Sequence, residues 1–231
     1  MTAAPVKPAG VYLEIGSKRV FASALDWPGW CRAGRDEQSA LERLLEYGPR
    51  YRAAVASVAS DFDPPTSPRA FRVVERLSGD ATTDFGAPGA IADGDWQPLP
   101  ATELERSERL LQACWLAFDD AAQTADGRPL AKGSRGGGRS LTKMREHVLE
   151  ADRAYANQVG GPGPRGTTVA TWPTAQQRLL EVVRARARGE LPDRGPRGGL
   201  RWPARYAIRR SAWHALDHAW EIEDRSSEDQ Q

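Results

Sequence analysis

The stretch Arg209-Arg-Ser-Ala-Trp-His-Ala-Leu-Asp-His-Ala-Trp220 decides the fold of the C-terminal half of this chain. Pro203 stands shortly before it and suits the first turn of a helix, which we expect to continue to about Arg225. Residues four apart lie on the same face of a helix, so the imidazoles of His214 and His218 can reach one ion. The stretch therefore predicts a helix that carries two neighbouring metal ligands.

A third histidine lies on another predicted helix. Ser140 can cap this helix, which we expect to end near Gly160, and core-type residues flank His147 on it. The chain has three histidines in all, and the two helices that carry them are expected to pack together. Three protein ligands leave a coordination position open for water or substrate, as in catalytic zinc sites. We predict an open three-histidine metal site; the alternative is that the histidines are solvated or hydrogen-bonded helix residues.

Two further helices complete the prediction for the C-terminal half. Helical patterns cover Glu103 to Gln123 and Pro173 to Gly189, and links rich in glycine, proline and arginine separate them from the histidine helices. Four helices joined by short links favour an antiparallel bundle, because each link lets the chain turn back on itself. We place this four-helix bundle over residues 100–231.

Residues 1–99 have the pattern of a small α+β module. Short apolar runs alternate with turns, and Asp36 is well placed to cap a helix. The expected elements are strands at Val11–Ile15, Arg19–Leu25 and Phe71–Leu77 and helices at Glu37–Tyr47 and Pro49–Ala59. The first two strands should form a β-hairpin. The predicted fold class is therefore α+β, with a β-hairpin/helix module followed by the bundle.

Two acidic residues are candidates for a catalytic or orienting role beside the metal. Glu150 lies three residues after His147, and Glu221 lies three residues after His218, so each carboxylate can share a face with a ligand. Either could act as a general base or orient an imidazole. The alternative is a solvated helix face that carries ion pairs.

The segment Gly133-Ser-Arg-Gly-Gly-Gly-Arg139 precedes the helix of His147 and has the composition of an anion-binding loop. A helix N-terminus and two arginines can hold a phosphate or carboxylate. If the loop binds, Arg135 and Arg139 would hold an acidic cosubstrate near the mouth of the site. The segment lacks the Gly-Lys-Ser/Thr ending of a P-loop, which argues against nucleotide hydrolysis. A flexible linker is the alternative.

Composition narrows the function class. Lysine and arginine total 32 and aspartate and glutamate total 31, so the formal net charge of +1 argues against bulk binding to nucleic acid or membrane. The basic stretch over residues 184–210 fits an ion-paired surface. The N-terminal residues lack the apolar segment of a secretory signal, and Cys31 and Cys114 do not suggest a disulfide framework. We expect a cytoplasmic protein that acts on a small molecule.

Two pieces of the C-terminal half resemble the DinB/YfiT-like family of metalloenzymes. They are Arg145-Glu-His-Val-Leu-Glu-Ala-Asp-Arg-Ala-Tyr155 and the Arg209–Trp220 stretch. In that family one histidine comes from the second helix of a four-helix bundle and a His-x-x-x-His pair comes from the last. The resemblance covers roughly residues 101–225 and implies that His147, His214 and His218 are ligands of a divalent metal.

The same resemblance implies a cofactor and a reaction class. Zinc is the first choice of metal, with nickel or iron as alternatives. Several members of the family use low-molecular-weight thiols, and for a chain this rich in arginine, alanine and glycine the implied thiol is mycothiol. The expected activity is that of a thiol-dependent S-transferase or a metal-assisted hydrolase.

The N-terminal part has a weaker resemblance to HicB-like domains, over about residues 10–50. It rests on the strand, Pro-Gly turn and strand of Arg19–Gly34 and on the helix Asp36–Leu45. The resemblance implies a small α+β module that serves as a dimerisation unit, which would make the protein a homodimer, or as a lid. It also leaves a second function open, a non-enzymatic, metal-stapled binding or antitoxin-like regulatory protein.

Overall fold

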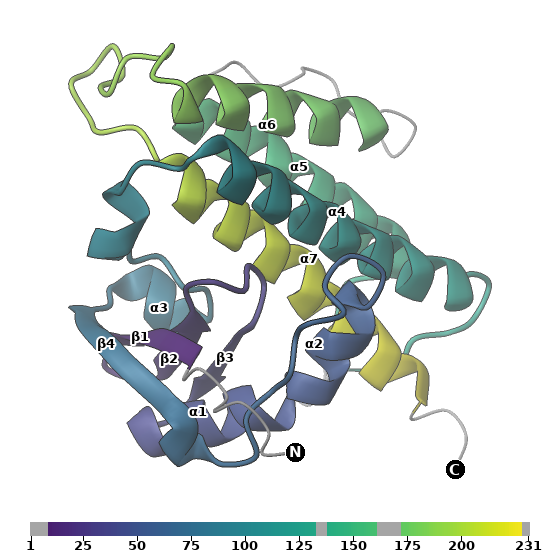
Figure 1. The fold of residues 1–231 in the computed structure, drawn as a ribbon. Helices are drawn as coiled ribbons and strands as arrows, with labels where there is room; N and C mark the ends of the chain where they lie inside the picture. Colours follow the sequence, from purple (N-terminus) through teal and green to yellow (C-terminus); the bar gives the residue numbers. More distant parts are fainter. Residues whose placement is uncertain (1–8, 133–137, 161–171, 228–231) are drawn as a thin grey trace. The chain divides into compact units, whose positions relative to one another are not determined.

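The computed structural model describes residues 9–132, 138–160 and 172–227 (Figure 1). The chain forms two compact units, Met1–Gln97 and Pro98–Gln231. The described residues contain seven α-helices and one four-stranded mixed sheet. The predicted α+β class is confirmed. No helix among these residues combines the length and apolar composition needed to cross a bilayer.

The first unit is built on the sheet, whose strands lie in the order β3-β2-β1-β4. The strands are β1 (Ala9–Ile15), β2 (Val20–Ala24), β3 (Cys31–Gly34) and β4 (Phe71–Ser78). The predicted hairpin is confirmed, because β1 and β2 pair antiparallel with Val11 opposite Ala24 and Ile15 opposite Val20. β4 pairs parallel with β1 at one edge. The central strands β1 and β2 are buried nearly throughout, whereas β4 has a buried Phe71 at its start and then alternates between exposed and half-buried positions.

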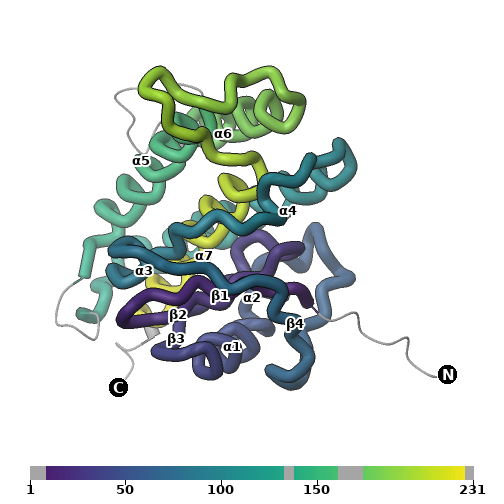
Figure 2. Tube along the Cα trace, turned by 90° about the vertical axis from the view of Figure 1, so that its left-hand side faces the viewer, coloured from purple at the N-terminus to yellow at the C-terminus, as the bar shows by residue number. Residues whose placement is uncertain are grey.

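Local sequence explains the helices of this unit, which are α1 (Glu37–Glu46), α2 (Gly48–Val55) and α3 (Ala81–Phe85). α1 begins where predicted, because Asp36 accepts a hydrogen bond from the Ser39 amide at 2.8 Å and donates its own amide to the Ser39 hydroxyl at 3.1 Å. α1 packs against β2 and β3 (Figure 2). α2 is shorter than the predicted helix and ends at Val55.

An aromatic cluster closes the core of the first unit. The turn Trp27-Pro-Gly-Trp30 is tight because Gly29 adopts a φ of 95°, a conformation that favours glycine. It brings Trp30 against Tyr51 and Phe62, with ring centroids 6.0 and 5.0 Å away. The Trp30 indole donates to the Leu44 carbonyl at 2.9 Å, so the buried polar atom is satisfied.

A buried carboxylate ties the segment after β4 to the sheet. Glu14 on β1 is 0% exposed and accepts three hydrogen bonds. The donors are the Thr83 hydroxyl at 2.5 Å and the amides of Gly89 and Ala90, both at 2.9 Å. Both carboxylate oxygens are engaged, so the cost of burying Glu14 is offset by donors from α3 and the turn that follows it.

The second unit contains four helices, α4 (Ala101–Thr124), α5 (Leu141–Val159), α6 (Trp172–Ala187) and α7 (Ala204–Ser227). α4 packs on α7, and α5 packs on both α6 and α7. Each helix lies within a few residues of its predicted place. Arg184 of α6 forms two hydrogen bonds, at 2.8 and 2.7 Å, with the largely buried carboxylate of Glu108 on α4. This pair links the two helices.

We predict that Glu14→Gln destabilises the protein by about 1–3 kcal/mol. In the wild type each carboxylate oxygen accepts from a backbone amide, whereas the NH₂ group of glutamine would place a donor against one of these amides and leave it without an acceptor. Urea denaturation measures the change. Glu42→Gln, on the exposed side of α1, is the matched control and should change stability by less than about 0.5 kcal/mol. Equal unfolding midpoints for Glu14→Gln and wild type would contradict the role given to Glu14.

Candidate metal centre

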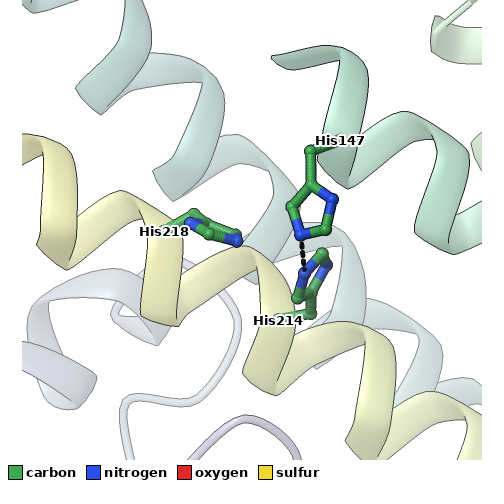
Figure 3. A group of neighbouring side chains, drawn as sticks. All are labelled: His147, His214 and His218. Atoms are coloured by element: carbon green, nitrogen blue, oxygen red, sulfur yellow. Dashed lines mark hydrogen bonds between the residues drawn. The ribbon is translucent and has the colours of Figure 1, made fainter. Parts of the chain in front are cut away.

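Two helices of the second unit place the three histidines. His147 lies on α5, where Met144 and Val148 on the same helix are fully buried and anchor it in the core. His214 and His218 lie on α7, whose central part is buried nearly all round. Figure 3 shows the three imidazoles converging from the two helices. His214 and His218 are 6% and 7% exposed, and His147 is partly exposed.

The spacing of the ring nitrogens suits a metal ion. The Nε2 atoms of His147 and His214 are 3.1 Å apart. One ligand nitrogen from each of the three histidines can be chosen so that all lie within 4.8 Å of one another. Nitrogens bound at about 2.0–2.1 Å in a tetrahedral zinc site are separated by about 3.4 Å. The three histidines therefore form a cluster that could hold a metal ion, as the sequence predicted.

Glu221 orients one of these imidazoles. Its Oε2 lies 2.9 Å from Nδ1 of His218, and its Oε1 accepts a hydrogen bond from Arg225 at 3.1 Å. The hydrogen bond from His218 lowers the pKa of Glu221, which keeps the carboxylate ionised. An ionised carboxylate cannot donate, so Nδ1 of His218 carries a proton, and Nε2 is the nitrogen left to bind a metal ion. This carboxylate–histidine arrangement is typical of metal ligands.

Burial keeps two of the imidazoles in the form that binds metal. It is the main cause that lowers the pKa of His147 to about 4, with the positive charges of His218 and Arg139 as smaller causes. The pKa of His214 is lowered well below its usual value, first by burial and then by His218 and Arg210. Both rings are therefore neutral at pH 7, so a metal ion could bind either one without first displacing the proton of an imidazolium.

Two arginines give the cluster a positive surround. The exposed Arg139 acts electrostatically on both His147 and His214, and its backbone carbonyl accepts a hydrogen bond from Arg225 at 3.1 Å. Arg210 lies one helical turn before His214, with its guanidinium 4.6 Å from the ring of Trp213. Sequence reasoning proposed Arg139 but missed Arg210. The four-residue spacing from His214 was the available signal.

The other predicted site residues have different positions. Glu150 is exposed on α5 and does not belong to the histidine cluster. It is rotated by about 60° from His147 around the helix, on the side away from the buried positions of Met144 and Val148. Arg135 lies outside the described residues. Of the two acidic candidates, only Glu221 touches a histidine of the cluster.

Comparisons with family models, with curated proteins and with solved structures found no match to this chain. The resemblance to the DinB/YfiT-like family stays a prediction from the sequence, and so does the resemblance to HicB-like domains.

We predict that Glu221→Gln weakens zinc binding about 10- to 100-fold, because an amide no longer holds the proton of His218 on Nδ1. Competition against a chromogenic chelator measures the affinity. Glu150→Gln is the matched control, since Glu150 has the same spacing from His147 but is exposed. Equal losses in the two variants would refute an orienting role for Glu221.

We also predict that His147 in the metal-free protein stays neutral down to about pH 5, since its pKa is about 4. Its folded pKa lies below the usual 6.5, so the stability that it contributes is complete above pH 6.5 and is lost as the pH falls towards 4. A pH titration of the imidazole carbon and nitrogen shifts by NMR checks this. A midpoint near 6.5 would show that the ring is solvated.

Proposed function

We propose that this chain is a divalent-metal enzyme of the DinB/YfiT-like kind, with His147, His214 and His218 as the metal ligands. The observation that carries the proposal is the convergence of these imidazoles from α5 and α7, with two Nε2 atoms 3.1 Å apart. In this proposal the helices α4 to α7 form the antiparallel four-helix bundle of that family. The match in order, one histidine from the second helix and a pair from the last, supports it.

The donor set favours zinc. Neutral imidazoles suit zinc, nickel, copper and iron, whereas carboxylate and carbonyl oxygens suit magnesium and calcium. Zinc accepts three protein nitrogens and a fourth, exchangeable ligand without a strong geometric preference of its own. Among the described residues no fourth protein group joins the cluster, which supports an open position for substrate. Nickel and iron are the alternatives that elemental analysis distinguishes.

Of the two candidate reactions, the surroundings favour thiol-dependent S-transfer over hydrolysis. When bound, a zinc-like cation would lower the pKa of a coordinated water or thiol. Glu221 is held between His218 and Arg225, so it keeps a proton in place rather than exchanging one with substrate. Glu150 is exposed and outside the cluster. A thiolate needs no general base once it is ionised, whereas an attacking water usually does.

The positive surround supports an anionic cosubstrate. Arg139 and Arg210 both lower the pKa of His214, so both act on the space around the cluster. The same field stabilises a thiolate or a carboxylate-bearing thiol relative to its neutral form. Mycothiol is the thiol that the resemblance implies. The first unit would serve as a HicB-like module, either a homodimerisation unit or a lid.

We expect the protein, purified without a histidine tag, to contain about one equivalent of zinc, nickel or iron. The variant His214→Ala/His218→Ala should lose it, because one imidazole alone cannot hold the ion. Elemental analysis of both proteins measures this, with Glu150→Gln as a control that should retain the metal.

Full metal retention in the double variant would contradict the proposed metal site. No metal in the wild-type protein, even after incubation with divalent ions, would instead favour a non-enzymatic binding or regulatory protein with structural histidines. If the metal is present, thiol transfer to an electrophile should depend on it, and removal with a chelator should abolish the rate.

A further inference from the structure

Polar contacts run along the whole interface between α5 and α7. At one end Arg225 donates to the Arg139 carbonyl at 3.1 Å, and at the other the Trp202 amide donates to the Gln158 carbonyl at 3.0 Å. Residue numbers rise along α5 as they fall along α7, so the two helices run antiparallel here. The histidine cluster lies between these ends. A hydrogen bond between the side chains of Ser211 and Asp152 also joins α7 to α5.

This hydrogen bond is deeply buried and lies beside the cluster. Ser211 and Asp152 are each 1% exposed, and the serine hydroxyl donates to Oδ1 of Asp152 at 2.5 Å. Asp152 comes five residues after His147 on α5, and Ser211 comes three residues before His214 on α7. Oδ2 of Asp152 and the indole Nε1 of Trp115 on α4 are both buried, and neither makes a hydrogen bond of good geometry among the described residues. Burial raises the pKa of Asp152 to about 7, although hydrogen bonding from Ser211 and, more weakly, from the Trp115 indole acts in the opposite direction.

Stability does not explain this pair. Burying a carboxyl group carries a desolvation cost that one hydrogen bond offsets only in part. An apolar pair of similar volume at such a position is often neutral or stabilising. The known benefit of a buried polar contact is that it selects one register between two helices, because a hydrogen bond is directional and apolar packing is not.

The histidine cluster needs α5 and α7 to be aligned along their axes to within a fraction of one residue. Shifting one helix along another by a single residue moves its side chains by about 1.5 Å. Metal–ligand distances tolerate deviations of only about 0.2 Å. His147 is the one ligand that comes from α5, so its distance from His214 and His218 depends on where α5 sits along α7.

We propose that Asp152 and Ser211 are a positioning pair for the histidine cluster: their buried hydrogen bond fixes the register of α5 on α7 and so sets where His147 meets His214 and His218. The inference rests on the proposed metal-binding function. Asp152 and Ser211 touch neither substrate nor metal in this scheme, and they act through the histidines.

Cobalt(II) titration tests the pair, because the visible band of bound cobalt reports ligand geometry and the titration gives the affinity. In Asp152→Val/Ser211→Ala we expect a thermal midpoint equal to or above that of wild type, cobalt affinity reduced about 10-fold or more, and a changed visible band. Asp152→Asn should restore affinity and band, because the amide oxygen still accepts from Ser211.

Glu108→Gln/Arg184→Gln is the control, since that pair, in which Glu108 is largely buried, joins α4 to α6 and does not bear on the contact between α5 and α7. It should lower the thermal midpoint and leave the cobalt affinity and band unchanged. If Asp152→Val/Ser211→Ala does not fold, Ser211→Ala alone carries the same test, because it removes only the hydroxyl donor.

Wild-type affinity and an unchanged band in Asp152→Val/Ser211→Ala, or in Ser211→Ala alone, would overturn the positioning role and leave the metal site intact. A wild-type protein that binds no cobalt would overturn the proposed metal function, and this inference with it. The two failures are therefore distinguished by the wild-type titration.

Discussion

The contact between α5 and α7 buries polar side chains from both helices, and the candidate site depends on which hydrogen-bond partners those side chains find. Apolar packing brings the helices together but tolerates small shifts along their axes. The polar groups do not, because each must meet a partner at a fixed distance. Histidines, a serine hydroxyl and a carboxyl group share this interface, so its packing and its chemistry are set by the same contact.

Burial also sets the charges of the site. It lowers the pKa values of His147 and His214 and raises that of Asp152. The interior of the interface therefore favours neutral groups. The ionised groups, Glu221 with Arg225, lie beside His218 and hold its proton on the side away from the ligand nitrogen. A cation placed here would meet neutral donors inside an electrostatically positive surround, which suits an anionic fourth ligand.

Two of the buried carboxyl groups, those of Glu14 and Asp152, show how hydrogen bonding relates to the role of such a group. Glu14 in the first unit accepts three hydrogen bonds that engage both of its oxygens, as expected of a structural link. Asp152 in the second unit has one well-formed hydrogen bond, on Oδ1, and its buried Oδ2 has only a weak interaction with the Trp115 indole. Partly satisfied buried groups cost stability, and in some proteins they are retained because they select one register between helices.

The sequence by itself determined the features that depend on neighbours along the chain. The cap at Asp36, the hairpin of β1 and β2, and the shared face of His214 and His218 all follow from local hydrogen bonding and from the periods of helix and strand. Glu150 and Glu221 have the same spacing from a histidine, and only the tertiary structure showed that Glu221 contacts the histidine cluster whereas Glu150 does not. It also revealed Asp152 with Ser211 and the parallel pairing of β4 with β1. The physical reason is that helical periodicity says which residues share a face, whereas burial and partners depend on which distant element covers that face.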